Sequence, residues 1–237
     1  MRSRFSAPAV ACLVPLAVLL ASCDGTISVT FATGPQVFDV TASALELPTE
    51  LMTMDGTIDG VECGPMGMCP PGDVVTLTCE EGVCDPAPRT LSAPVGMVVD
   101  VEDLLAETRE VGLRVVDTYD VEAVEYTIQR NTLSVPIGEV EVYWGPEAAT
   151  TIESPEVHRF GTLPAIAAGE EGSGQMAIDP AGEAALSDYL VAGGDRPPSI
   201  RFFARTRVDL DPGDPWPSGD LRVGVNVTVR AVGSVVD

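Results

Sequence analysis

The chain has 237 residues and a formal net charge of −23, because 36 acidic side chains face only 13 basic ones, all of them arginines. Affinity for nucleic acids depends on basic side chains that neutralise phosphates, so this charge argues against a nucleic-acid partner and against anionic lipid headgroups. The length allows one large β domain or two small ones.

The first 22 residues have the three-part layout of a secretory signal. Arg2 and Arg4 precede an uncharged, mainly apolar run, Phe5–Ala21. This run is short for the ~30 Å hydrocarbon core of a bilayer and contains two prolines, which favours a cleaved signal over a transmembrane helix. The run leads into Leu20-Ala21-Ser22-Cys23, which resembles the lipobox of bacterial lipoproteins.

The lipobox resemblance covers residues 1–23 only and implies a lipid anchor. It implies cleavage before Cys23, a diacylglyceryl thioether on this cysteine, and acylation of its amino group by a chain such as palmitate. Asp24 resembles a signal that keeps some Gram-negative lipoproteins in the inner membrane, but the rule varies between lineages, so both membranes stay open. A strand pattern begins by about Thr26, which would hold the folded part within roughly 10–15 Å of the membrane at ~3.5 Å per residue.

Alternation of apolar and polar residues recurs along the rest of the chain. Such a period of two is typical of half-buried antiparallel strands. The clearest runs are Ile27–Phe31, Val124–Ile128, Val140–Trp144, Ile200–Leu210 and Leu221–Val229. Turn signals that separate strands occur at Gly34-Pro35, Asn131-Thr132, Gly145-Pro146 and 211–220. Many short strands with such turns indicate a mainly β, antiparallel sandwich or barrel over residues 23–237.

Four cysteines remain once Cys12 is assigned to the leader and Cys23 to the lipobox. They lie in an insertion at about residues 55–90, and they are Cys63, Cys69, Cys79 and Cys84. An even number in an exported chain predicts two disulfides, whereas a zinc site lacks its usual C-x₂-C spacing here. The spacing leaves the connectivity open, with a slight preference for neighbour pairing, because Glu80–Val83 can form a hairpin turn between the last two cysteines.

One helix is predicted near residue 180. Asp179 can cap its N-terminus, Pro180 suits the first helical position, and Gly193-Gly194 can end it. Leu186 and Leu190, four residues apart, would face the protein. We therefore expect a crossover helix that covers an edge or an end of a sheet.

Three further segments carry weaker signals. A second helix is predicted over Val101–Arg109. The stretch Val124–Pro136 resembles a hairpin from Ig-like or LEA-14-like sandwich domains, which implies an Ig-like, non-enzymatic β-sandwich. Residues Gly169–Gly174 are rich in glycine but acidic, so they are predicted to form a loop rather than a phosphate-binding turn.

The sequence offers little support for catalysis. His158 is the only histidine, and it lies in a strand-like stretch where a surface or edge position is expected. No G-x-S-x-G elbow, P-loop or G-x-G-x-x-G motif occurs. Trp144 and Trp216 are the only tryptophans that could stack on sugars. A hydrolase that depends on His158 is therefore the least favoured class.

Calcium is the one metal that the sequence suggests. Hard cations take several oxygen ligands from one turn, and four aspartates surround a loop rich in proline and glycine, namely Asp209, Asp211, Asp214 and Asp220. The spacing does not match an EF-hand. Ordinary solvated acids are the simpler interpretation, and no cofactor is expected.

Five arginines fall on the polar faces of the last two predicted strands, and they are Arg201, Arg205, Arg207, Arg222 and Arg230. In one interpretation they form cross-strand pairs with acids such as Glu139 and Glu141, each worth ~0.2–1 kcal/mol. In the other they form a basic face that docks an acidic partner. The pairing interpretation is favoured.

The sequence as a whole predicts a lipid-anchored protein of the bacterial cell envelope. A signal peptide at residues 1–22 would precede a β-sandwich that acts in a structural role or in binding an envelope protein, without catalytic activity. The alternative is a cation- or carbohydrate-binding accessory domain of an envelope complex.

Overall fold

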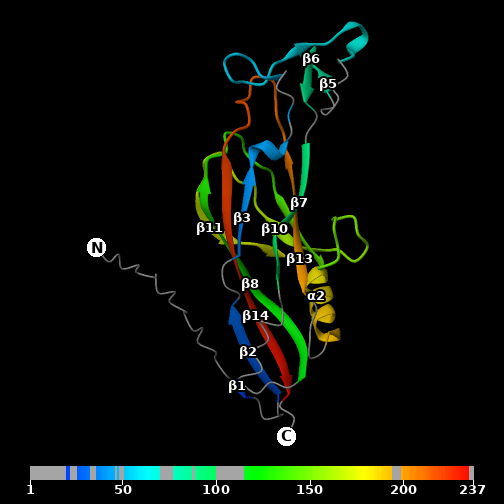
Figure 1. Cartoon of the computed structure of the whole chain (residues 1–237), viewed down its shortest axis with the longest axis vertical. Coiled ribbons are helices and arrows are strands. Elements are labelled where there is room, and N and C mark those ends of the chain that lie inside the picture. The colour runs from blue at the N-terminus through cyan, green and yellow to red at the C-terminus, as the bar shows by residue number, and fades with distance from the viewer. Residues whose placement is uncertain are drawn as a thin grey trace, which may run out of the picture.

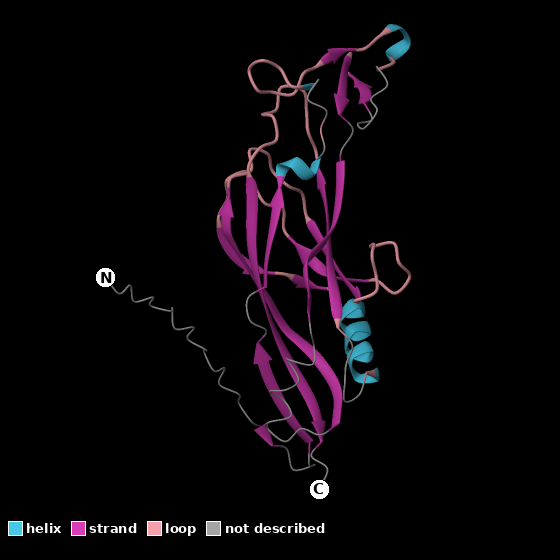
Figure 2. Cartoon of the chain, viewed as in Figure 1, coloured by secondary structure: helices cyan, strands magenta, loops and turns pink. Residues whose placement is uncertain are grey.

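A computed structural model describes residues 20–21, 26–32, 36–45, 47, 51–69, 77–86, 89–99, 115–193 and 199–234. Over these residues the chain is mainly antiparallel β with one α-helix, as predicted, and its shape is elongated (Figure 1, Figure 2). Cys23, the helix expected at 101–109 and the turn at Gly34-Pro35 lie outside the described residues.

The first sheet contains six strands in the order β1-β2-β14-β8-β11, with β3 also paired to β14. Their bounds are Leu20–Ala21 (β1), Thr26–Ala32 (β2), Gln36–Thr41 (β3), Val115–Asn131 (β8), Gly172–Gln175 (β11) and Asp220–Ser234 (β14). β2 pairs with residues 228–234 of β14 and β3 with residues 220–225, so these two strands follow one another along the same side of β14. The 3₁₀ turn η1, Ala42–Leu45, follows β3.

The second sheet contains five strands in the order β12-β10-β9-β13-β7. Their bounds are Arg89–Val99 (β7), Val140–Pro146 (β9), His158–Leu163 (β10), Ala177–Ile178 (β12) and Ile200–Val208 (β13). The two sheets share one apolar core, in which Val124, Tyr126 and Leu221 of the first sheet join Trp144 and Phe160 of the second. All five alternating runs that predicted strands lie in these two sheets, in a β-sandwich arrangement.

The hairpin expected at Val124–Pro136 is not formed. β8 runs unbroken to Asn131 between β14 and β11, and the next strand, β9, belongs to the other sheet. The chain turns after Asn131, whose Oδ1 accepts a hydrogen bond from Leu133 N while Nδ2 donates to Ala167 O and Glu170 O. This turn directs the chain out of the first sheet.

The glycine-rich loop is also partly a strand. Residues Gly172–Gln175 pair with Glu125–Ile128 of β8, because the backbone groups on that edge of β8 need partners. Gly174 allows this close pairing, since a Cβ atom there would come within 2.7 Å of the Tyr126 hydroxyl. The expected loop is therefore correct only before residue 172.

The predicted helix is confirmed as α2, Pro180–Ala192. Asp179 caps it by accepting hydrogen bonds from Ala181 N (2.9 Å) and Gly182 N (3.3 Å). Leu186 and Leu190 are buried, also as predicted. None of the helices in the described part of the chain has the length and hydropathy of a membrane span.

α2 covers an edge of β8 that β11 does not reach. Glu183 Oε1 accepts a hydrogen bond from Val121 N at 2.7 Å, and Ser187 Oγ accepts one from Tyr119 N at 2.9 Å. The helix thus satisfies backbone donors that would otherwise be available to another strand.

A small third sheet and the loop after its first strand contain the cysteines. Its order is β4-β6-β5, with bounds Val61–Glu62, Val83–Pro86 and Leu77–Glu80, and the short 3₁₀ turn η3 spans Pro65–Gly67. Residues 51–69 and 77–86 form this part, which we call the cystine tip. It lies at one end of the molecule, and the C-terminus lies at the other (Figure 1).

Two disulfides are present, but the preferred neighbour pairing is wrong. Cys63 pairs with Cys79 and Cys69 with Cys84, with Cα–Cα distances of 5.9 and 5.6 Å. The predicted turn between the last two cysteines does form the β5–β6 hairpin, in which Cys79 and Cys84 are opposite each other. Each of them bonds instead to one end of the 63–69 loop, which is thereby attached to the hairpin at both ends.

The tip is fastened to the sandwich by the loop that precedes β14. Ile58 N donates to Asp214 O at 2.8 Å, Gly213 N donates to Ile58 O at 2.9 Å, and Trp216 N donates to Gly56 O at 2.8 Å. Ile58 is also buried in the core. The tip is therefore attached to the sandwich by hydrogen bonds and by a buried side chain, in addition to the chain connections.

Candidate interaction surfaces

Arg205 is the centre of a polar network on the outer face of the second sheet. It stands opposite Glu141 in the β13–β9 register, and its Nε donates to Glu141 Oε2 at 2.8 Å. The guanidinium group lies 5.1 Å from the centre of the Tyr143 ring and also donates to the Tyr143 hydroxyl. Arg159 of β10 approaches Glu141 from the other side, at 3.6 Å. The predicted pairing of strand arginines with acids such as Glu141 is thus found for Arg205.

This network stabilises the charged form of Glu141. Burial acts to raise the pKa of this carboxyl, but hydrogen bonds from Arg205 and Tyr143 and the positive charges of Arg205 and Arg159 hold the pKa below its ordinary value. Burial and the hydrogen bond to Glu141 raise the pKa of Tyr143. Glu141 is therefore ionised at neutral pH and Tyr143 is not.

The other predicted arginines are dispersed. Arg207 pairs with Asp209 at 2.8 Å on β13, whereas Arg230 on β14 pairs with Asp120 at 2.7 Å. Arg222, also on β14, lies 3.9 Å from Asp39.

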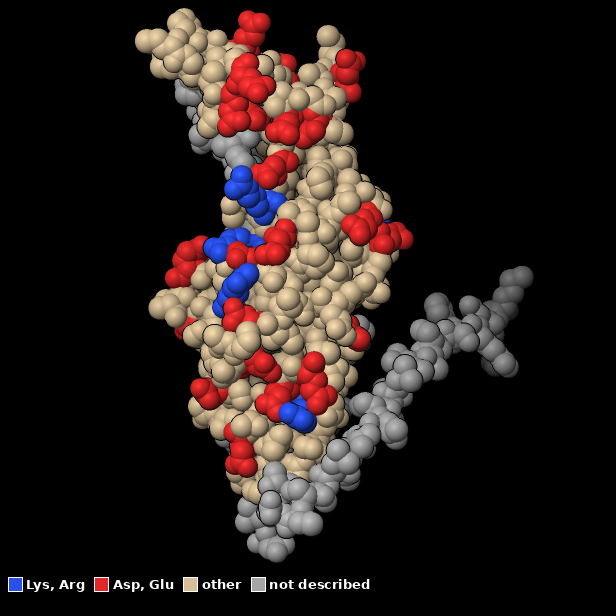
Figure 3. Space-filling model, turned by 180° about the vertical axis from the view of Figure 1, so that it is seen from behind, with Lys and Arg blue, Asp and Glu red and all other residues tan. Residues whose placement is uncertain are grey.

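Because β13 and β14 belong to different sheets, the five arginines do not form one basic face. Where arginines appear in Figure 3, acidic side chains lie beside them. Arg201 differs from the rest, because its Nε is buried with no hydrogen-bond partner in the described structure.

The four aspartates proposed for calcium do not converge. Asp209 is occupied by Arg207, and Asp220 pairs with Arg130 while accepting a hydrogen bond from Thr132 Oγ1 at 2.8 Å. Asp214 Oδ2 accepts from Asp211 N at 2.9 Å, which shapes the turn. Within the described ranges, three or more potential metal ligands come together only at Cys63, Cys69 and Cys84, which are held in disulfides.

An acid that the sequence did not single out lies beside this loop. Asp85, on β6, has a buried Oδ1 atom without a hydrogen-bond partner in the part of the chain that the structure describes. Burial, followed by the negative charges of Asp211, Glu80 and Asp214, raises the pKa of its carboxyl. Asp85 is separated from residues 211–214 by more than half the chain, so no local pattern could have grouped them.

The aromatic and histidine candidates have structural roles. His158 is exposed at the start of β10, as expected, and its ring stacks on that of Trp144 at 5.2 Å. Trp144 is buried and donates from Nε1 to Gly182 O of the helix at 2.9 Å, and Trp216 is half-buried. Trp144 therefore has no open face on which a sugar could stack, whereas Trp216 lines a surface groove together with Ser43 and Pro217.

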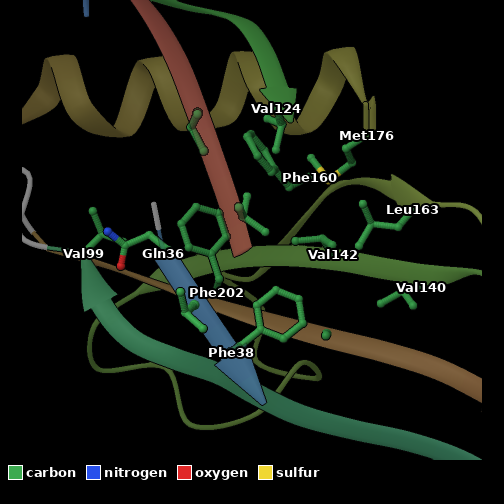
Figure 4. A pocket seen from close by; sticks show the side chains of 14 residues that line it. Gln36, Phe38, Val99, Val124, Val140, Val142, Phe160, Leu163, Met176 and Phe202 are labelled. Carbon is green, nitrogen blue, oxygen red and sulfur yellow. The ribbon is translucent and has the colours of Figure 1, made fainter. Parts of the chain in front are cut away.

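One apolar pocket lies between the sheets (Figure 4). Its volume is about 80 Å³, well below the ~300–1,000 Å³ of a typical small-molecule site. Gln36 of β3, beside Val99 in Figure 4, is the only polar residue of the lining. The rest is aliphatic or aromatic, including Phe160 and Phe202. The pocket is a small gap in the core, without a group that could perform chemistry.

Comparison with known proteins gives little guidance. No family model matches the chain, and no curated protein sequence is similar to it. Among solved structures, a chain of turnip yellow mosaic virus is 11% identical with a TM-score of 0.22, over 76% of this chain and 93% of that one. A chain of infectious bursal disease virus strain Gx is 14% identical with a TM-score of 0.27, over 75% of this chain and 42% of that one.

Proposed function

We propose that the protein is a lipid-anchored interaction module of the bacterial cell envelope, tethered through Cys23. The observation that carries the proposal is the strand register next to the lipobox: Thr26, three residues after Cys23, pairs with Ser234. This pair lies at the end of the molecule opposite the cystine tip (Figure 1). An anchor at Cys23 would hold that end at the membrane and point the tip away from it.

Cleavage before Cys23 would also remove β1. In the structure, β1 pairs with β2 through Leu20 with Ser28 and Ala21 with Ile27. The anchored form would therefore begin almost at β2, with too short a tether to move far from the membrane. Its partners would then be proteins within reach of the membrane surface.

The anchor is tested by comparing the native protein with Cys23→Ser in a bacterial host. The native form should incorporate an alkyne analogue of palmitate and fractionate with membranes, whereas the serine variant should do neither. In-cell crosslinking of the two forms then tests the interaction role, and only the anchored form should capture a membrane-proximal protein. Equal labelling of both forms, or crosslinks from neither, would refute the proposal.

Cation binding is a second candidate, and the one observation that favours it is the buried Asp85 Oδ1 atom, which has no hydrogen-bond partner in the described structure. Its test is thermal unfolding with millimolar Ca²⁺ or Mg²⁺ at constant ionic strength. A site there would raise the melting temperature of the native protein with Ca²⁺ and not that of Asp85→Asn. Identical curves with and without Ca²⁺ would remove this candidate. Carbohydrate binding has no comparable support, because Trp144 is buried and Trp216 is only half-exposed.

A further inference from the structure

The cystine tip exposes methionines. Six large apolar side chains are exposed in the described residues, and four of them are tip methionines: Met52, Met54, Met66 and Met68. Met54 and Met66 are almost completely accessible, at 107% and 90%. Exposed apolar side chains that cluster on one part of a soluble protein indicate a contact surface. The flexible thioether chain of methionine suits surfaces that adapt to a partner.

The methionines are displayed on a rigid frame. Cys63 and Cys69 flank the Met66–Met68 segment, and each is bonded to the β5–β6 hairpin. Met66 itself has φ of 68°, a left-handed conformation that a residue with a side chain adopts at some energetic cost. A segment held this firmly loses little further freedom when it binds.

The second methionine pair is held in a similar way. Met54 lies in a tight turn that is closed by a backbone hydrogen bond from Thr53 N to Thr57 O at 2.9 Å. The side-chain hydroxyls of Thr53 and Thr57 are also 2.8 Å apart. Both pairs therefore occupy fixed positions at the same end of the molecule.

The tip is acidic and carries no basic side chain. Residues 51–86 contain neither lysine nor arginine. Among the described residues of this range, the exposed acids are Asp55, Asp59, Glu62, Glu80 and Glu81. Figure 3 shows acidic side chains and no basic side chains at this end of the molecule, and the surface around them is uncharged. A partner must therefore offer positive charge as well as apolar side chains.

From this combination we propose that the cystine tip binds a cationic amphipathic segment of an envelope protein, with methionines contacting its apolar side chains and acids pairing with its lysines or arginines. The inference rests on the proposed interaction function and names its surface and the chemistry of the partner. A second copy of the tip is unsuitable because like charges repel, and an anionic membrane is unsuitable for the same reason.

A peptide probe tests the chemistry with the soluble form, residues 23–237 carrying Cys23→Ser. The probe is a fluorescent amphipathic helix of about 18 leucines and lysines, and its control peptide has glutamine in place of every lysine. Fluorescence anisotropy should detect binding of the cationic peptide only. The affinity should fall as NaCl is raised, because salt screens the charge pairs.

Matched variants locate the site. Met54→Gln with Met66→Gln, and separately Glu80→Gln with Glu81→Gln, should each weaken peptide binding by about tenfold or more, as loss of anchor contacts does in other interfaces. The controls are Val115→Gln, an exposed apolar residue far from the tip, and Glu125→Gln with Glu171→Gln, two exposed acids of the sandwich. These should change the affinity less than twofold. Circular dichroism and intact disulfides verify that each variant is folded.

Two results would overturn the proposal: no binding of the cationic peptide, or equal weakening by tip and control variants, which would mean diffuse attraction to the whole acidic surface. Photocrosslinkers placed at Met54 and at Val115 in cells distinguish a wrong binding surface from a wrong proposed function. Crosslinks from Val115 alone would leave an interaction module with a different surface. Crosslinks from neither position would reject both.

Discussion

At the scale of single residues, Asp85 is a half-buried acid, with one buried oxygen atom, that we expect to lower stability at neutral pH. Its pKa is raised by burial and by neighbouring acids, so folding favours the protonated form. The cost is absent below the ordinary pKa of about 3.8 and develops as the pH rises through the raised value. Asp85→Asn should therefore increase the free energy of unfolding by roughly 1 kcal/mol at pH 7 and by nothing at pH 3.

Urea unfolding at both pH values measures this effect. Asp59→Asn is the matched control, because Asp59 is an exposed acid of the same tip. It should change stability less than Asp85→Asn does. A loss of stability in Asp85→Asn at pH 7 would mean that the carboxylate has a stabilising partner.

Arg205 should stabilise the fold through the ionised form of Glu141. Because the pKa of Glu141 is held below 4.5, this contribution is present above pH 4.5 and is lost as the pH falls through the lowered value. Both side chains are about one third exposed, which weakens the pair through solvent screening. Arg205→Gln should cost about 0.5–1 kcal/mol at pH 7, and the cost should shrink in acid.

Arg207→Gln provides the comparison for Arg205→Gln. Arg207 and Asp209 are 65% exposed, so their pair should contribute nothing measurable to thermal unfolding. If Arg207→Gln proved as destabilising as Arg205→Gln, burial would not determine how much each ion pair contributes to stability.

The sequence predicted only some of the contacts at the candidate sites. Arg205 and Glu141 could be paired from the sequence because alternation in two neighbouring strands determines which side chains share a face. Arg159 could not be added, because its approach depends on the order β10-β9-β13 within the sheet. The exposed methionines escaped notice because methionine is usually a core residue, and only the fold shows which methionines lack cover.

At the scale of elements, α2 stabilises the sheet by covering an edge of β8. Glu183→Ala with Ser187→Ala removes the acceptors for Val121 N and Tyr119 N and should cost roughly 1–3 kcal/mol in urea unfolding. Glu183→Gln retains an acceptor and should keep most of the stability. Asp188→Ala, on the exposed side of the same helix, should be nearly neutral. An equal loss in Asp188→Ala would indicate a general effect on helix formation instead.

The disulfides of the tip can be mapped directly. Cyanogen bromide cleaves after Met66 and Met68, Asp-N cleaves before Asp73, and Glu-C cleaves after Glu80 and Glu81, so the four cysteines fall on separate peptides. Mass spectrometry should find the Cys63 peptide joined to the Cys79 peptide. Each bond then closes a loop of about 15 residues, for which chain entropy gives roughly 3 kcal/mol. A Cys63–Cys69 linkage would contradict the structure.

Strands and helices with a clear residue pattern of their own were predictable from the sequence. Elements that form only by pairing with a distant strand were not. β14 alternates because Leu221 and Val223 enter the core, and α2 begins at Asp179 because its side chain caps the helix. β11 is mostly glycine and serine, and it is a strand only because β8 provides a free edge. The cystine connectivity likewise depends on the 63–69 loop crossing the hairpin, a contact that spacing along the chain does not encode.

At the scale of the whole molecule, charge is distributed unevenly between the two ends. Arg130, Arg159, Arg205, Arg207, Arg222 and Arg230 of the sandwich are paired with acids in the described structure, whereas the tip has acids only. In the proposed orientation the tip, which has acids and no basic side chain, would lie farthest from the membrane. This arrangement places acids without basic neighbours where a basic partner can approach.

Excess negative charge should make stability depend on salt. Residues 23–237 contain 36 acids and 11 arginines, so repulsion between acids raises the free energy of the compact state, and salt screens this repulsion. The melting temperature of the Cys23→Ser form should therefore rise between low and ~0.5 M NaCl, by about 2–4 °C for each kcal/mol gained. Glu80→Gln with Glu81→Gln should flatten the rise, because these acids belong to the uncompensated tip. A fall in melting temperature with salt would mean that the arginine pairs of the sandwich outweigh the repulsion.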